Sequence, residues 1–394
     1  MLKQTKLLAA TLAIVIIGAV LAGYAQTWTS TSAQGKDYES VWASANGMII
    51  IASSSEWTPA ISTNYGSTWN NNNQATTITN IFSTLAASAD GSKWVGTFHS
   101  APDYIYVSTN TGSSWNPTAS ISSSQWEAVA SSASGAILAA ALFNGTIYYS
   151  TNFGSSWLPS GAPNKQWEAL SMSADGTKLF AAANNDTIYA LTNFNGIWTP
   201  TGAGSSTWSS LAGSADETRL VASTSSGTFV SSNSGANWFP GTNIAGRVTS
   251  SADGSKLAVF SGSRIYSSSD FGNTWVSNNW PNSTFFQNIC ASADGNRLFA
   301  VGNGLGIWTC QLTPAPNLNI SSNIRLNIHH PAATNVMISW LVPSTNFVLQ
   351  RSLDLTTTSW STVTNPPVLN LTNLQNQVTL TLPAGSAFYR LSTP

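Results

Sequence analysis

The chain has 394 residues, a formal net charge of −1 and only 7% charged residues. So few Lys and Arg residues cannot form the basic surface that a phosphate backbone requires, which argues against nucleic acid as a partner. The 17 Trp, 15 Phe and 10 Tyr provide the side chains of a large core, and the polar remainder is rich in turn-forming Ser, Thr, Asn and Gly. The composition predicts an all-β protein.

Residues 1–25 are predicted to be a secretory signal peptide. Lys3 and Lys6 precede an uncharged apolar run, and Gly23-Tyr24-Ala25 places small residues at the positions that a signal peptidase reads. We favour cleavage near Ala25 over retention as a membrane anchor. No later segment is apolar enough to span a bilayer. We therefore expect the mature protein to be secreted or on the cell surface, without a membrane span.

Two short units recur along the chain at intervals of roughly 40 residues. One is a "SADG"-type turn, which begins at Ser44, Ser88, Ser132, Ser173, Ser214, Ser251 and Ser292. The other has forms such as "STNFGSSW" and "SSDFGNTW", and it ends at Trp69, Trp115, Trp157, Trp198, Trp238 and Trp275. Each repeat divides into an inner strand, an Ala-rich second strand, a third strand and an outer strand that begins at the Trp. Such a repeat is typical of a β-propeller.

The number of units predicts how many blades the propeller has. Seven "SADG"-type turns are present but only six complete hairpins, because the last repeat stops at "GIWTCQL" without an outer strand. The segment "QTWTSTSA" from Gln26 belongs to no complete repeat and would supply the missing strand with Trp28. We therefore predict a seven-bladed propeller over residues 26–311, closed by the mature N-terminal strand so that no sheet edge is left open.

The Trp-containing unit is predicted to be a folding device. The Asn (Asp270 in one copy) accepts backbone hydrogen bonds in an Asx-type turn, the Gly takes a positive φ, and the Trp packs between adjacent blades. In the fourth copy Asn195 stands in the glycine position, and Asn tolerates that conformation best among the other residues.

These residues resemble the Asp-box (BNR, bacterial neuraminidase) repeat, whose pattern is Ser-x-Asp-x-Gly-x-Thr-Trp. The resemblance covers residues 26–311 and implies a sialidase-like propeller, a fold shared with xyloglucan hydrolases, sortilin-type receptors and photosystem II assembly factors. In that family the box lies away from the functional face. It therefore indicates architecture and says little about activity.

Residues 312–394 no longer follow the repeat. Pro314 and Pro316 mark a linker over 312–318. Short alternating strands such as "NVMISWLV" and "QVTLTL" then predict a small β-sandwich over 319–394. This part resembles the fibronectin-III-like modules of exported bacterial proteins, which implies spacing or surface attachment, with carbohydrate binding as the alternative.

Cys290 and Cys310 are the two cysteines of the chain. They are predicted on the first and third strands of the last blade, about 10 Å apart, which is too far for an easy disulfide. We interpret both as small apolar core residues.

Arginine is too rare for a sialidase site, which needs an arginine cluster around the substrate carboxylate. The propeller contains Arg219, Arg247, Arg264 and Arg297. Arg219 and Arg297 share a repeat position with lysines just after the "SADG" turn, so they are predicted to be solvated charges on the face opposite the site. A sialidase is therefore poorly supported.

One inner-strand position collects polar side chains near the expected functional face. It holds Glu39, Ser83, Glu127, Glu168, Ser209, Gly246 and Gln287, each after a residue that we expect to pack between blades. Loops of the same face add Trp57, His99, Asp103 and Trp280, and an exposed Trp beside carboxylates suits a sugar ring or a protein anchor. The candidate ligand-binding residues are Glu39, Trp57, His99, Asp103, Glu127, Glu168, Arg247 and Trp280. The glutamates could also merely solvate the channel mouth, and His99 with Asp103 could merely stiffen a loop.

The sparse titratable groups favour a non-enzymatic, monomeric binder of a glycan or an extracellular protein. The alternative is a glycoside hydrolase or lyase for a neutral polysaccharide, with a pair among Glu39, Glu127, Glu168 and Asp103 within about 5 to 9.5 Å. An assembly factor of the photosystem kind would show a basic patch. Only Arg247 and Arg264 remain after the two turn arginines, and two scattered arginines do not form such a patch. No Cys/His cluster has metal-ligand spacing and no glycine-rich phosphate loop precedes a helix, so we expect no metal and no cofactor.

Overall fold

The structure is a computed structural model that contains β-strands joined by turns. It describes residues 28–33, 37–54, 59–71, 82–98, 104–118, 125–194, 196–262, 264–278, 286–302, 304–311, 327–332, 335–341, 348–352, 360–365, 368–370, 375–381 and 388–392. Over these ranges no helix has the length and apolar character that a membrane crossing requires. The predicted signal peptide lies outside the described residues.

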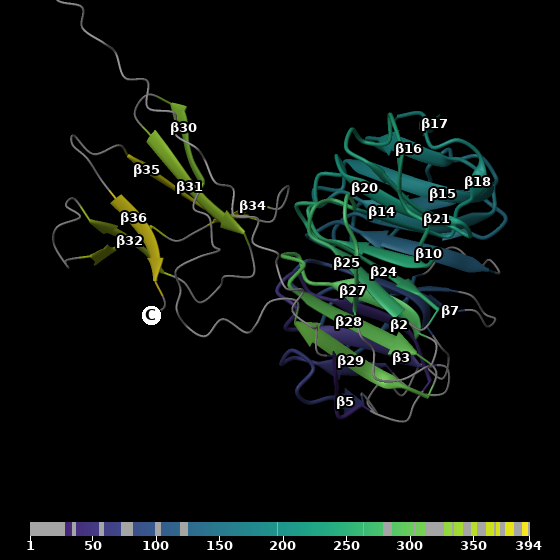
Figure 1. Ribbon diagram of the computed structural model, residues 1–394, viewed down its shortest axis with the longest axis horizontal. Coiled ribbons are helices and arrows are strands. Elements are labelled where there is room, and N and C mark those ends of the chain that lie inside the picture. Colours follow the sequence, from purple (N-terminus) through teal and green to yellow (C-terminus); the bar gives the residue numbers. More distant parts are fainter. Residues whose placement is uncertain are drawn as a thin grey trace, which may run out of the picture.

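The propeller consists of seven antiparallel sheets, each with the path inner, second, third and outer strand (Figure 1). Blades 1 to 3 are β2 (Tyr38–Ala43), β3 (Ile50–Ser54), β4 (Ala60–Ser62), β5 (Asn70–Asn71); β6 (Phe82–Ala87), β7 (Trp94–Phe98), β8 (Ile105–Ser108), β9 (Asn116–Pro117); and β10 (Trp126–Ser131), β11 (Leu138–Leu142), β12 (Ile147–Ser150), β13 (Leu158–Pro159). Blades 4 and 5 are β14 (Trp167–Met172), β15 (Lys178–Asp186), β16 (Ile188–Thr192), β17 (Thr199–Pro200), with β18 (Ser206–Thr207) paired to β15; and β19 (Ser210–Gly213), β20 (Leu220–Thr224), β21 (Gly227–Ser231), β22 (Phe239–Thr242). Blade 6 is β23 (Arg247–Ser250), β24 (Leu257–Ser261), β25 (Arg264–Ser268), β26 (Val276–Asn278).

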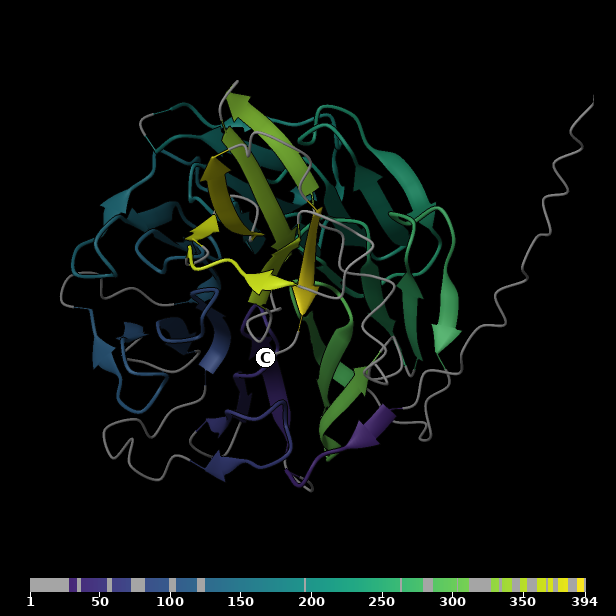
Figure 2. The same cartoon turned by 90° about the vertical axis from the view of Figure 1, so that its left-hand side faces the viewer.

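Blade 7 contains both ends of the propeller chain. It comprises β27 (Phe286–Ala291), β28 (Arg297–Gly302), β29 (Gly306–Gln311) and, as its outer strand, β1 (Trp28–Ser30). Trp28 lies opposite Cys310 and Ser30 opposite Trp308 in an antiparallel ladder. In Figure 2 the colours pass in order around the ring, and purple β1 lies beside the green strands of this blade. The predicted seven blades and their closure through Trp28 are confirmed.

A closed belt of backbone hydrogen bonds joins the seven "SADG"-type turns. The alanine N–H of each turn donates to the alanine carbonyl of the next turn, at 2.7 to 2.8 Å, in the order Ala45, Ala89, Ala133, Ala174, Ala215, Ala252, Ala293 and back to Ala45. Because the belt returns to its start, every blade is bonded to both neighbours at this face. The repeat did not predict these bonds, since they join turns of different blades.

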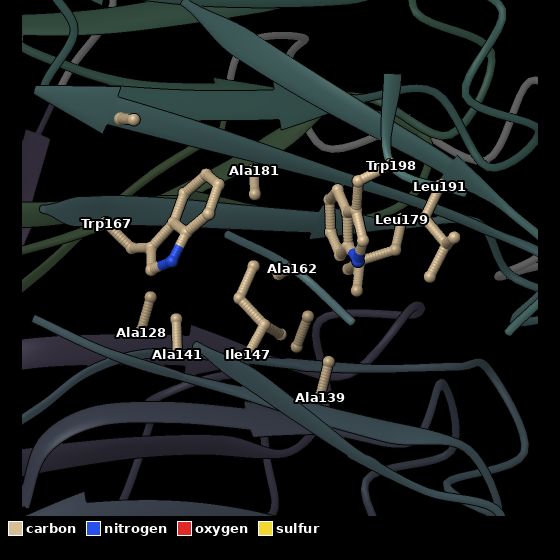
Figure 3. Packing of buried hydrophobic residues seen from close by; sticks show 12 residues of the cluster. Ala128, Ala139, Ala141, Ile147, Ala162, Trp167, Leu179, Ala181, Leu191 and Trp198 are labelled. Atoms are coloured by element: carbon tan, nitrogen blue, oxygen red, sulfur yellow. The ribbon is translucent and has the colours of Figure 1, made fainter. Parts of the chain in front are cut away.

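The core lies in the seams between blades, as Figure 3 shows for blades 3 and 4. Trp167 and Trp198 of blade 4 pack with Ala128, Ala139 and Ile147 of blade 3, all buried. Small side chains on the second strands let neighbouring sheets approach closely, and burial of the indoles removes a large apolar area from water. The prediction that these tryptophans pack between blades is confirmed.

The Trp-containing units form the predicted turns. In blade 3 the Asn152 Oδ1 accepts the Ser156 N–H at 2.9 Å, the Ser150 Oγ accepts the Gly154 N–H at 2.9 Å, and Gly154 has φ 81°. Among the described residues of the fourth copy, Asn193 is left-handed, with φ 62°. Asn195, expected to replace the glycine there, lies outside the described residues.

The cations after the "SADG" turns bond to a neighbouring turn, which the repeat did not predict, although Arg219 is exposed to solvent as expected. Lys178 Nζ donates to the Asp216 carbonyl at 2.8 Å, Lys256 Nζ to the Asp294 carbonyl at 3.0 Å, and Arg219 Nη1 to the Asp253 carbonyl at 3.3 Å. Each cation therefore bonds the turn of the following blade. Adjacent blades converge at this face, which brings that carbonyl within reach of the side chain.

The C-terminal part contains two sheets. One has the order β30 (Asn327–Ala332), β31 (Asn335–Leu341), β35 (Gln375–Thr381), β34 (Val368–Asn370), and the other β33 (Ser361–Thr362), β32 (Val348–Ser352), β36 (Phe388–Ser392). Ile338 and Val378 of the first sheet cluster with Leu349 of the second. A small apolar core thus lies between the two sheets.

The two cysteines are free, as predicted. Cys290 is on β27 and Cys310 on β29, with β28 paired between these strands. Burial raises the pKa of both thiols, that of Cys310 to about 12. Both therefore remain in the unreactive thiol form at neutral pH.

Candidate functional site

The inner strands carry a bulge at the position that the repeat singled out. The ladders of β2, β6, β10, β14 and β27 with their second strands each shift register there. The extra residues are Glu39, Ser83, Glu127, Glu168 and Gln287. A bulge takes its extra residue out of the regular ladder and redirects it, and such positions often lie beside binding sites. In blades 5 and 6 the equivalent Ser209 and Gly246 directly precede β19 and β23.

Glu127 and Glu168 occupy this position on adjacent inner strands, β10 and β14, and the charge of Glu127 acts on Glu168. Both side chains are half-buried. Burial raises the pKa of Glu168 above its ordinary value, and the nearby negative charge of Glu127 raises it further. The positive charge of Arg247 and a hydrogen bond from the Asn184 side chain act in the opposite direction without cancelling the rise. Glu168 is therefore protonated more readily than an ordinary glutamate.

Arg247 reaches this pair from blade 6. It is the first residue of β23 and its side chain is exposed. Its Nη1 donates to the Ser209 carbonyl at 3.1 Å, which holds the guanidinium at blade 5. Glu168 of blade 4 thus lies within range of the charges of two other predicted residues, Glu127 of blade 3 and Arg247 of blade 6. We call these three residues the mouth triad.

The remaining predicted residues are not part of the mouth triad in the described structure. Glu39 occupies the same bulge position on β2, but blade 2 separates it from Glu127. Trp57, His99, Asp103 and Trp280 lie outside the described residues. The aromatic part of the predicted site is therefore not placed.

A wall of cross-linked residues extends over blades 3 to 5, next to Glu168. Lys165 and Asp186 form an ion pair at 2.6 Å, and the Trp167 Nε1 donates to the Gly145 carbonyl at 2.8 Å. β15 runs on to Asp186 and there pairs with β18, which links blade 4 to the segment entering blade 5. Neither this wall nor Asn184 was among the predicted site residues, and the Asn-Asn-Asp end of the second strand is the sequence signal for both.

The mouth triad offers two carboxyl groups and one guanidinium to a ligand. Carboxylates accept from N–H and O–H groups, a protonated Glu168 can also donate, and Arg247 can hold a carboxylate through two N–H groups. Across the described residues, no group of three or more His, Cys, Asp or Glu side chains is arranged to hold a metal ion.

Comparison with known proteins identifies the fold. No family model matches the chain, and no curated protein matches it either. A solved structure of YCF48 bound to D1 peptide has a TM-score of 0.58 at 14% identity, over 74% of this chain and 98% of that one. The GH74 xyloglucanase from Xanthomonas campestris has a TM-score of 0.60 at 13% identity, and the GH74 enzyme of Niastella koreensis 0.55 at 19% identity.

The two GH74 matches differ in coverage from the YCF48 match. They include 80% and 70% of this chain but only 59% and 43% of the respective GH74 chains. Identities this low establish a shared propeller architecture and leave the chemistry of the site to its own residues.

Proposed function

We propose that this protein is an exported, non-catalytic binding propeller that holds a segment of an extracellular protein at its mouth triad. The observation that carries the proposal is that Glu168 of blade 4 is within range of the charges of both Glu127 of blade 3 and Arg247 of blade 6. A peptide segment offers amide groups and side chains of both charges, which match two carboxyls and a guanidinium. A neutral glycan has no charged group that could pair with the carboxyls or with the guanidinium.

The half-buried position of the pair favours a stable contact. A charge that is already partly desolvated in the free protein loses less hydration when a ligand covers it. The wall of blades 3 to 5 also holds its residues in place before binding, which lowers the entropy lost on association. A solved propeller of this architecture is bound to a peptide. These points support a protein ligand over a glycan.

Export and the role of the C-terminal part belong to the same proposal. The apolar leader before Ala25 supports secretion or display at the cell surface as a monomer. The Asp-box resemblance supports a sialidase-like propeller, and the fibronectin-III-like resemblance of residues 319–394 supports a spacer or attachment role.

The test is a peptide-display selection and a glycan array with purified residues 26–394. For a peptide so found, Glu168→Gln and Arg247→Ala should each weaken binding about tenfold or more, since each removes one partner of a charge pair. Glu39→Gln is the matched control, because Glu39 has the same bulge position on blade 1, and it should bind as the parent does. Unchanged binding in both site variants would refute the site. Selective binding to the glycan array would show that the ligand is a glycan and not a protein segment.

A second function is favoured by the unequal carboxyls. Two neighbouring glutamates, one with a raised pKa, suit the acid and base of a glycosidase, and two GH74 enzymes share the fold. Under this alternative the protein would hydrolyse a neutral polysaccharide. Release of reducing ends that disappears in Glu168→Gln and persists in Glu39→Gln would establish it, and no release from any neutral polysaccharide would leave the binding function.

A further inference from the structure

One of the seven "SADG"-type turns differs from the others at its fourth position. The residue there is left-handed in every turn, and it is glycine in six of them: Gly47, Gly91, Gly135, Gly176, Gly254 and Gly295. In blade 5 it is Glu217, with φ 53°, and its N–H donates to the Ser214 carbonyl at 2.9 Å as the glycines do in their turns. A left-handed non-glycine residue costs about 1 to 2 kcal/mol. The backbone itself therefore gives no reason for a glutamate.

Side chains of the preceding blade cover these positions. A Cβ on Gly176 would lie 2.6 Å from Ile137 Cδ1, and one on Gly254 would lie 2.7 Å from Arg219 Cβ. In blade 5 the residue in the covering position is Lys178. The side chain of Glu217 consequently turns away from the surface and into the seam between blades 4 and 5.

The seam has a compartment for this carboxyl group. Glu217 is only 1% exposed, and its Oε1 accepts a hydrogen bond from Ser171 Oγ of β14 at 2.6 Å. A Cβ on Gly213 of β19 would lie 2.1 Å from the Glu217 Oε2, so only glycine leaves room there. At the equivalent place the other six inner strands have Ala43, Ala87, Ser131, Met172, Ser250 and Ala291. Blade 5 thus departs from the other blades at two positions that touch: Gly213 leaves the room that the Glu217 side chain occupies.

The charges around Glu217 do not neutralise it. Lys178 on β15 is the nearby cation, but its Nζ donates to the Asp216 carbonyl. Asp216, in the same turn, carries a negative charge. Within the described residues, the Glu217 Oε2 has no hydrogen-bond partner. Burial raises the pKa of Glu217 to about 8, against the smaller opposing effects of Ser171 and Lys178.

We propose that Glu217, with Ser171 and Gly213, forms a proton-operated latch of the seam between blades 4 and 5. The closed seam holds the neutral carboxylic acid. Loss of its proton to the buffer would leave a buried carboxylate whose nearby cation, Lys178, bonds the Asp216 carbonyl instead, so ionisation accompanies opening of the turn at 214–217. Opening breaks the belt bond from the Ala174 N–H to the Ala215 carbonyl, 2.7 Å long in the closed form. The belt then opens at this seam before any other.

The test is amide hydrogen exchange of the belt alanines between pH 5 and 9, corrected for intrinsic rates. The open seam exposes the carboxyl to water with an ordinary pKa near 4.5, and the closed seam has a value of about 8. Protection of the Ala174 amide should therefore fall about tenfold per pH unit between these values and then level off. The Ala133 and Ala252 amides, which bond across seams whose turns have glycine, should show no such fall.

Two variants separate the latch from general destabilisation. Glu217→Gln keeps the shape but cannot ionise, and its Ala174 protection should be independent of pH. The double variant Gly213→Ala with Glu217→Gly restores the residues that other blades have at these positions. It replaces Glu217→Gln in the exchange experiment if that variant does not fold. The proposal is overturned if Ala174 keeps the same pH dependence in either variant, or if Ala133 and Ala252 follow it in the parent protein.

Discussion

At Gly246, directly before Arg247 of the mouth triad, the backbone leaves no room for a side chain. Its φ is 151°, and a Cβ would lie 1.5 Å from the Phe260 carbonyl oxygen of the neighbouring strand β24. The Gly246 carbonyl also accepts the Ser223 Oγ of blade 5 at 2.5 Å. This one residue therefore sets how closely β23 approaches both β24 and blade 5, and with it the place of Arg247.

Gly246→Ala should lower the free energy of unfolding by about 2 to 4 kcal/mol, because the methyl group forces a backbone shift. Gly161→Ala is the matched control. Gly161 is also left-handed, with φ 76°, but nothing lies within 4 Å of the place that an alanine methyl group would take there. Gly161→Ala should lower the free energy of unfolding by only about 1 kcal/mol. Urea unfolding followed by tryptophan fluorescence measures both, and equal losses would show that the contact with Phe260 is relieved at no cost.

At the scale of one element, the "SADG" turn is held by its aspartate. In blade 4 the Asp175 Oδ1 accepts the Ser173 Oγ at 2.6 Å, the Thr177 N–H at 2.9 Å and the Thr177 Oγ1 at 2.8 Å. Burial raises the pKa of Asp175, but these hydrogen bonds together lower it below its ordinary value of 3.8. Blade 3 has Ser134 instead, with longer bonds of 3.2 and 3.3 Å. The turn can therefore form without the aspartate, but with weaker bonds.

Asp175→Ser should cost about 1 to 2 kcal/mol of stability at pH 7. A lowered folded-state pKa means that the stabilisation is complete above the unfolded value of 3.8 and is lost as the pH falls through the folded value. The difference between parent and variant should therefore shrink between pH 6 and pH 2.5. Urea unfolding at several pH values measures it, and a difference that stays constant down to pH 2.5 would contradict a role for the charge.

For the whole molecule, closure of the ring depends on two separate devices. The belt joins all seven turns at one face, and β1 completes blade 7 at the outside. Trp28 of β1 is 5% exposed and packs against Phe260 and Ile265 of blade 6. The first residues of the propeller thus hold its last two blades together.

Trp28→Ala should lower the free energy of unfolding by about 3 to 5 kcal/mol, the usual loss for a buried Trp. Ser30→Ala, at an exposed residue of the same strand, should change the free energy of unfolding by less than about 0.5 kcal/mol. Deletion of residues 26–33 would leave β29 with an open edge, so self-association in sedimentation is expected. A stable, monomeric deletion variant would show that closure does not depend on β1.

The order of residues along the chain by itself determined the architecture. The repeat spacing, the count of seven turns against six complete hairpins and the additional Trp28 segment are local patterns, and strands and turns form from local patterns. Residue types alone also pointed to Glu127, Glu168 and Arg247. Only the tertiary structure decided that the charges of Glu127 and Arg247 act on Glu168 while a whole blade separates Glu39 from Glu127, because this depends on bulges and on the order of blades around the ring. It also decided that the turn cations bond the next blade and that Glu217 lies buried opposite Gly213, since such contacts depend on how neighbouring blades pack and not on the local sequence of either turn.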